Sequence, residues 1–195
     1  MAAMRLTTVL CAALMLSVLP ARQGTSADGK STEATAASAH AFAFTAIAGG
    51  ELDLSRFAGQ PILLVNTASR CGYTDQYADL ETLWDRYKDD GLVVLAVPSN
   101  DFRQELASEQ AVKQFCETTF DVSFPMTGIS HVSGRDAHPL YQWLGAKLGA
   151  EGRPRWNFHK VLIDGDGQPV AGWRSGTRPT DAAIVRRIER LLPTG

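Results

Sequence analysis

The chain has 195 residues, of which 45% are hydrophobic and 21% are charged, and its formal net charge is −2. This length allows one domain with a substantial core plus a tail, and the composition is that of a globular protein. The small net charge argues against a nucleic-acid-binding surface and against a polybasic membrane-binding surface. It leaves both anionic and neutral small substrates open.

Residues 1–27 have the layout of a secretory signal. Arg5 precedes an uncharged apolar run from Leu6 to Leu19, and small residues follow that run. The run is shorter than the roughly 18 residues that indicate a membrane span. We therefore expect an exported, periplasmic protein whose signal is cleaved near Ala21 or Ala27, with a retained N-terminal membrane anchor as the alternative.

A flexible linker is predicted over residues 28–39, because small and polar residues occur there without any apolar periodicity. The folded domain is expected to occupy residues 40–195. Its first predicted element is a β-hairpin, in which alternating apolar residues lie on either side of the turn Gly49-Gly50.

A strand–helix–strand unit follows the hairpin. The short β-branched run from Ile62 to Val65 predicts a buried strand, apolar residues at helical spacing predict a helix from Thr74, and Leu92–Val97 predicts a second buried strand. Such a unit places its two strands parallel. Cys71 falls on the turn before the helix, where backbone N–H groups and the helix dipole favour a thiolate.

The remaining pattern adds three helices and a second hairpin. Helices are predicted at 108–120, with Cys116 on the buried stripe, at 138–148, and after a capping Thr180; a hairpin is predicted over 158–173. The order of elements predicts an α/β protein with a thioredoxin-like fold, in which helices flank a central mixed β-sheet and a β-hairpin precedes it.

Four segments of this domain share their order and spacing with a known family. They are Val65-Asn66-Thr67-Ala68-Ser69-Arg70-Cys71-Gly72-Tyr73-Thr74, Pro98-Ser99-Asn100-Asp101-Phe102-Arg103-Gln104-Glu105, Phe124-Pro125-Met126 and Trp156-Asn157-Phe158. Together they resemble the glutathione peroxidase family in its cysteine, non-selenium form, from about Phe42 to the C-terminus. The resemblance implies a thiol peroxidase that reduces hydrogen peroxide or organic hydroperoxides.

The resemblance also implies a catalytic tetrad of Cys71, Gln104, Trp156 and Asn157. A thiolate that attacks a peroxide oxygen becomes a sulfenic acid, and the oxygen that leaves needs a proton. Amide and indole N–H groups stabilise both the thiolate and the leaving oxygen without adding a competing base. Taken singly, Trp156 also fits a core position, and the two amides also fit loop positions.

Cys116 matches the resolving cysteine of the thioredoxin-dependent branch of that family. This match implies a disulfide with Cys71 and a thioredoxin-type protein or glutathione as reductant. Cys71 lies on the turn before one predicted helix and Cys116 lies on another, and a disulfide needs Cα atoms within about 7 Å, so the helix at 108–120 would have to unwind locally. The alternatives are a buried core thiol or one half of a structural disulfide.

Other classes of protein fit the sequence less well. A disulfide-exchange protein needs a second cysteine three or four residues after the first, where Thr74 and Asp75 stand. A redox sensor without peroxidase turnover uses the same cysteines and remains an alternative. The four histidines lack metal-ligand spacing, so neither a metal nor a cofactor is expected. The short connection at 145–154 predicts a monomer.

Overall fold

The computed structural model describes Met1 and residues 38–193. The predicted signal segment at 1–27 and most of the predicted linker at 28–39 lie outside the described residues. Ala39, which the sequence places in the linker, is buried in a 3-10 helix at Ala39–Ala41, and its N–H donates to the Gly167 carbonyl at 2.9 Å. In the part of the chain that is described, no helix is long and apolar enough to cross a membrane.

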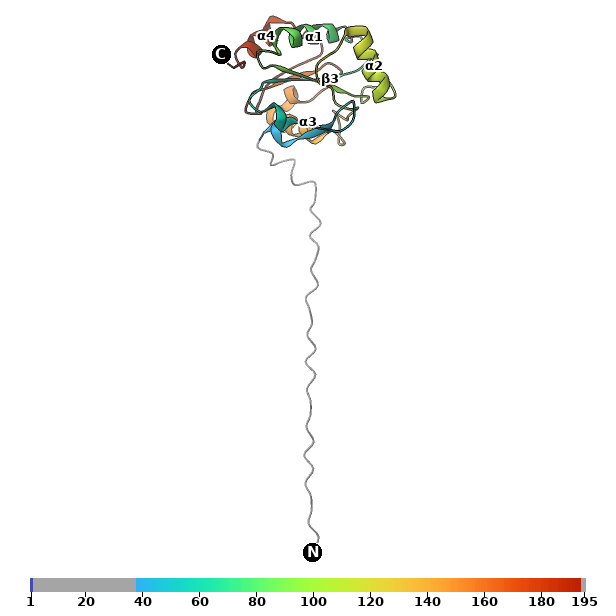
Figure 1. Cartoon of the computed structure of the whole chain (residues 1–195), viewed down its shortest axis with the longest axis vertical. Coiled ribbons are helices and arrows are strands. Elements are labelled where there is room, and N and C mark those ends of the chain that lie inside the picture. Colours follow the sequence, from blue (N-terminus) through green and yellow to red (C-terminus); the bar gives the residue numbers. More distant parts are fainter. Residues whose placement is uncertain (2–37, 194–195) are drawn as a thin grey trace.

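The sheet is built around β3 (Ile62–Thr67), as Figure 1 shows. Its strand order is β4-β3-β5-β6, where β4 is Val93–Pro98, β5 is Lys160–Ile163 and β6 is Pro169–Trp173. Strand β3 runs parallel to β4 and antiparallel to β5, so the sheet is mixed, as predicted. Every residue of β3, β4 and β5 is buried, which explains why these strands are nearly continuous apolar runs.

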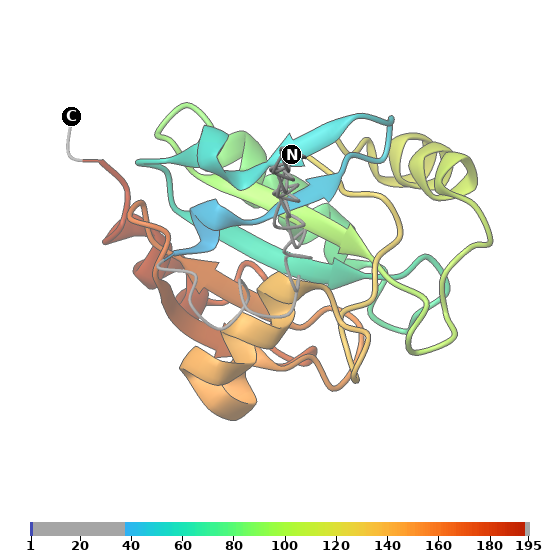
Figure 2. The same ribbon diagram turned by 90° about the horizontal axis from the view of Figure 1, so that it is seen from below.

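Helices cover both faces of the sheet. The elements that cover it are α1 (Gln76–Tyr87), α2 (Glu109–Phe120), α3 (Pro139–Leu148), α4 (Ala182–Glu189) and the hairpin of β1 (Ala43–Thr45) and β2 (Glu51–Asp53). Alternate residues of β3 divide between two cores: Leu63 lies in the core beneath α1 and α2, and Leu64 in the core beneath α3 and the hairpin. Figure 2, seen from below, places α3 and the hairpin in front of the sheet. This is the predicted thioredoxin-like arrangement.

The position at which a helix begins agrees with the sequence prediction where the sequence offers a single candidate for the capping residue. Ser108 Oγ accepts from the N–H of Ala111 at 3.3 Å, as expected. Helix α4 is capped by Asp181 rather than Thr180, because Asp181 Oδ1 accepts from the N–H of Ala183 at 2.8 Å. Helix α1 begins at Gln76 rather than near Thr74, whose hydroxyl bonds to the cysteine turn instead.

Two glycines allow a close approach beneath the segment that leads to Trp156. A Cβ added at Gly172 of β6 would lie 1.9 Å from the carbonyl oxygen of Glu151. A Cβ added at Gly152 would lie 2.1 Å from the carbonyl oxygen of Leu144. The 3-10 helix at Gly149–Gly152 therefore packs directly on α3 and β6.

We expect Gly172→Ala to lower the free energy of unfolding by about 2 kcal/mol or more, because backbone must shift to admit the methyl group. Denaturant unfolding measures this loss. Gly176→Ala is the matched control, since its Cβ would meet no atom within 4 Å. Equal stability of the two variants would contradict the close approach.

Candidate active site

Cys71 lies in the turn between β3 and α1 and is 8% exposed. The N–H of Tyr73 points at its sulfur, at 3.4 Å. Thr74 Oγ1 accepts from the N–H of Cys71 at 3.0 Å and donates to the carbonyl of Ala68 at 2.9 Å, so the turn is braced from both ends. Such an N–H group bonds a thiolate better than a thiol, which suits a nucleophilic sulfur.

Gln104 reaches the cysteine turn from the loop that follows β4. Its carbonyl accepts from the N–H of Arg70, the residue before Cys71, at 2.9 Å. Its side-chain Oε1 accepts from Asn157 Nδ2, also at 2.9 Å. Because the amide oxygen faces Asn157, the amide nitrogen of Gln104 is the atom left to donate to a reacting group. Two of the predicted site residues are thus in direct contact.

Asn66, at the end of β3, fixes the segment that carries Trp156 and Asn157. Its Nδ2 donates to the carbonyl of Trp156 at 3.1 Å, and its Oδ1 accepts from the N–H of His159 at 3.2 Å. Its backbone carbonyl accepts from the N–H of Phe158 at 2.6 Å. Asn66 is not among the predicted site residues, although an amide after an apolar run is a usable signal, because a buried amide needs partners.

Trp156 is 43% exposed, which does not fit a core side chain. Its ring lies against the ring of Phe102, with centroids 5.5 Å apart. Asn157 is fully buried, and its Oδ1 has no hydrogen-bond partner among the described residues.

Glu105 clamps the Gln104 loop to the cysteine turn. Its carboxylate is almost fully buried, and Oε1 accepts from the N–H of Ser69 at 2.9 Å and from the N–H of Leu106 at 2.8 Å. Burial raises the pKa of the Glu105 carboxyl, while these hydrogen bonds lower it. Glu105 belongs to one of the four shared segments, but the sequence does not show this function.

Cys116 is fully buried on α2, and both it and Cys71 are free thiols. Burial raises the pKa of the Cys116 thiol to about 11. Both cysteines belong to the core cluster on the α1 side of the sheet. In this state the two cysteines therefore do not form a structural disulfide.

A hollow of about 470 Å³ lies beside the cysteine turn. Its lining residues are Tyr73, Arg155, Trp156, His159, Arg174, Ser175 and Gly176. Within residues 38–193, Tyr73 and Trp156 are the large hydrophobic side chains that are exposed, at 37% and 43%. The hollow therefore combines an aromatic wall with two guanidinium groups.

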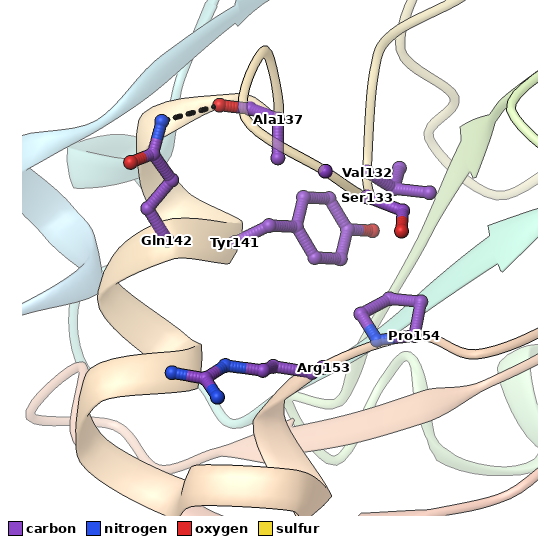
Figure 3. Close-up of a pocket in the computed structure, with 8 residues that line it drawn as sticks. Val132, Ser133, Ala137, Tyr141, Gln142, Arg153 and Pro154 are labelled. Atoms are coloured by element: carbon purple, nitrogen blue, oxygen red, sulfur yellow. Dashed lines mark hydrogen bonds between the residues drawn. The ribbon is translucent and has the colours of Figure 1, made fainter.

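A second hollow, of about 270 Å³, lies beside α3 (Figure 3) and contains none of the predicted site residues. Tyr141 lies between Ser133 and Val132 on one side and Arg153 and Pro154 on the other. The loop above it is fixed by Asp101, whose Oδ2 accepts from the N–H groups of Val132 and Ser133 at 2.7 and 2.9 Å. Asp101 thus holds this loop in place.

Among the residues described, no group of three or more His, Cys, Asp or Glu side chains could hold a metal ion. His159 lies near the proposed site, but its Nε2 contacts the carbonyl of Glu151 at 2.8 Å, and burial lowers its pKa.

We expect Asn66→Ala to lower the free energy of unfolding by about 2 kcal/mol, because backbone groups of the Trp156 segment lose their buried partners. The peroxide oxidation of Cys71 should slow about tenfold, since the donors are no longer held in place. Stopped-flow tryptophan fluorescence and denaturant unfolding measure the two effects. Asn66→Asp keeps the acceptor for His159 and should lose less. An unchanged oxidation rate in Asn66→Ala would contradict the positioning role.

Comparisons with known proteins agree with this geometry. A sequence model of the family "Glutathione peroxidase" matches residues 39–145. A protein of Halalkalibacterium halodurans named "Glutathione peroxidase homolog BsaA" is 42% identical over 158 residues, which cover 80% of this chain and 99% of that protein. A "Hydroperoxy fatty acid reductase" of Synechocystis is 38% identical, covering 78% of this chain and 95% of that protein.

The solved structures that the chain resembles include a crystal structure named "T. cruzi GPX1", with a TM-score of 0.63 and 34% identity. The match covers 79% of this chain and 95% of that one. With a family match over more than half of the chain and relatives near 40% identity along almost their whole length, the chain belongs to the glutathione peroxidase family.

Proposed function

We propose that Cys71 is the peroxidatic thiol, and that Gln104, Trp156 and Asn157 stabilise its thiolate and the leaving oxygen. Membership of the family makes the chain an oxidoreductase that reduces peroxides with a thiol. This assignment of residues rests on two hydrogen bonds. The N–H of Arg70 donates to the backbone carbonyl of Gln104, and Asn157 Nδ2 donates to Gln104 Oε1. Through its backbone Gln104 is thus joined to the residue before Cys71, and through its side chain it is joined to Asn157.

The chemistry uses neutral donors. The Cys71 thiolate attacks one peroxide oxygen, the O–O bond breaks, and the other oxygen leaves as water or an alcohol once it is protonated. The Gln104 amide and the Trp156 indole offer N–H groups that stabilise negative charge without taking up the proton. The product on the enzyme is a Cys71 sulfenic acid.

Cys116 is proposed to resolve this sulfenic acid as a disulfide, which a thioredoxin-type dithiol protein or glutathione then reduces. Because Cys116 is fully buried on α2, we infer that α2 opens locally in each cycle. The C-terminal end of α2 suits such opening: Asp121 caps it with a left-handed φ of 52°, which is unfavourable for a residue other than glycine.

One equivalent of hydrogen peroxide should convert the reduced wild-type chain to a form that has lost two hydrogens, as read by intact mass. Cys116→Ser should instead gain one oxygen, because its sulfenic acid has no second thiol, and Cys71→Ser should not react. Addition of a thioredoxin-type dithiol should restore the wild-type mass and sustain turnover, which a redox sensor would not do. A reactive Cys71→Ser variant would refute the assignment.

The hollow beside Cys71 favours organic hydroperoxides that carry an anionic group. Tyr73 and Trp156 offer apolar surface, while Arg155 and Arg174 offer cations at its rim. The relative named "Hydroperoxy fatty acid reductase" supports the same substrate class, since a fatty acid has an apolar chain and a carboxylate.

We expect Arg174→Gln to raise the KM for a fatty acid hydroperoxide about threefold, because an exposed ion pair contributes little more than that. The KM for cumene hydroperoxide, which has no carboxylate, should not change. Coupled peroxidase assays with both substrates measure this difference. Arg135→Gln, an exposed arginine outside the hollow, is the control. An equal rise for both substrates would contradict a role for the cation.

We further propose that the chain is exported to the periplasm and works as a monomer. The charged N-terminus followed by a short apolar run supports export. The short connection between α3 and β5, which contains the 3-10 helix at Gly149–Gly152, supports the monomer.

A further inference from the structure

The loop between β6 and α4 forms part of the wall of the hollow beside the cysteine turn. Arg174, Ser175 and Gly176 follow β6 directly and line this hollow together with residues of the proposed site. The loop continues to Asp181, which caps α4. The position of this loop, residues 174–181, therefore sets the shape of the hollow and the place of the Arg174 guanidinium.

Lys160, the first residue of β5, bonds this loop from the sheet. It is fully buried, and its register partner in β6 is Trp173, the residue before the loop. Its Nζ donates to the carbonyl of Thr177 at 2.6 Å and to the carbonyl of Ser175 at 3.3 Å. One buried side chain thus holds two backbone carbonyls of the loop.

Gln76, the first residue of α1, donates to the same loop. Its Nε2 bonds the Ser175 carbonyl at 2.7 Å, and its side chain is almost fully buried. On the outer side of the loop, Arg178 pairs with Asp75 and Asp79 at 2.9 and 2.6 Å, and the Arg178 side chain is half exposed. Because exposed ion pairs contribute little, the two buried donors are the stronger attachment of the loop to α1 and the sheet.

The burial of the Lys160 amine is unfavourable by itself. Burial lowers the pKa of this amine to about 7, while the carboxylate of Asp79 raises it and the guanidinium of Arg178 lowers it. Because the amine binds its proton more tightly in the unfolded chain, its burial lowers the free energy of unfolding at neutral pH. Fold stability therefore does not explain a lysine at this position, whereas two loop carbonyls that need donors do.

We propose that Lys160 is a positioning residue, which holds the 174–181 loop in place and so keeps the hollow in the shape that binds organic hydroperoxides. This proposal rests on the proposed use of the hollow for substrate. It gives Lys160 no contact with the peroxide and no part in the transfer of a proton. Its effect falls on substrates that are large enough to touch the loop.

The test compares Lys160→Met with wild type in the full chain, because methionine has a similar length and no N–H donor in its side chain. Hydrogen exchange followed by mass spectrometry measures the loop in the absence of substrate. Coupled peroxidase assays measure KM and kcat for hydrogen peroxide, cumene hydroperoxide and a fatty acid hydroperoxide. Lys147→Met is the matched control, since Lys147 is an exposed lysine of α3 outside the hollow.

We expect the amide hydrogens of residues 174–181 to exchange about threefold faster in Lys160→Met, while those of β3 and β4 keep their rates. The KM for both organic hydroperoxides should rise about fivefold with kcat unchanged, the effect of one lost hydrogen bond. The KM for hydrogen peroxide, which is too small to need the loop, should rise less than about twofold. In Lys147→Met, every quantity should match wild type.

Gln76→Leu removes the other donor to the Ser175 carbonyl and should change the same quantities in the same direction. This second variant decides the question by the same measurements if Lys160→Met does not fold. The reaction of Cys71→Ser with peroxide tests the proposed function separately, because it does not depend on the loop.

Three results would overturn the proposal. Loop exchange at the wild-type rate in Lys160→Met would show that the lysine does not hold the loop. An equal rise in KM for hydrogen peroxide and for the organic hydroperoxides would place the effect on Cys71 or on the fold. Faster loop exchange with wild-type KM values would show that the loop does not shape the substrate site, while leaving the role of Cys71 intact.

Discussion

The buried amide of Asn66 is the contact on which the rest of the site depends. Strand β3 ends in the turn that presents Cys71, and the same strand end must hold the segment of Trp156 and Asn157 beside it. Asn66 does this with four hydrogen bonds, two made by its side chain and two by its backbone N–H and carbonyl. An apolar residue there would leave backbone groups buried and unpaired, so the strand carries one amide in an otherwise apolar run.

Glu105 has the corresponding role for the loop that carries Gln104, and the group that it uses is a carboxylate. Its carboxylate accepts from the N–H groups of Ser69 and Leu106, and its other oxygen has no hydrogen-bond partner in the part of the chain that the structure describes. Burying a charge in this way is unfavourable unless backbone donors offset it. The unfavourable free energy of burying a charge thus falls on Glu105, which positions the loop. The groups proposed to meet the peroxide are neutral amides and an indole.

The strands and the reactive turn were predictable because each depends on residues close together in the chain. The apolar runs of β3 and β4 and the position of Cys71 required local patterns alone. The contact between Gln104 and Asn157 joins residues 53 positions apart. That both belong to one site was therefore predicted from the family resemblance and not from local spacing. Periodicity predicts a helix from Thr74 and does not show that the Thr74 hydroxyl bonds to the cysteine turn instead. Thr180 and Asp181 are adjacent candidates for the N-cap of α4, and the sequence pattern does not show that Asp181 is the residue that caps it.

The two cysteines differ in a way that orders the proposed cycle. Cys71 lies in a turn whose Tyr73 lines the open hollow, whereas Cys116 is fully buried in the core, where burial raises the pKa of its thiol to about 11. Such a thiol reacts slowly with peroxide in solution, because the thiolate is the nucleophile. In the proposed cycle, opening of α2 would bring the two sulfurs together, and a weak helix end would make that opening easier. A more stable α2 would therefore protect Cys116 further and slow the cycle, which places fold stability and turnover in opposition at this helix.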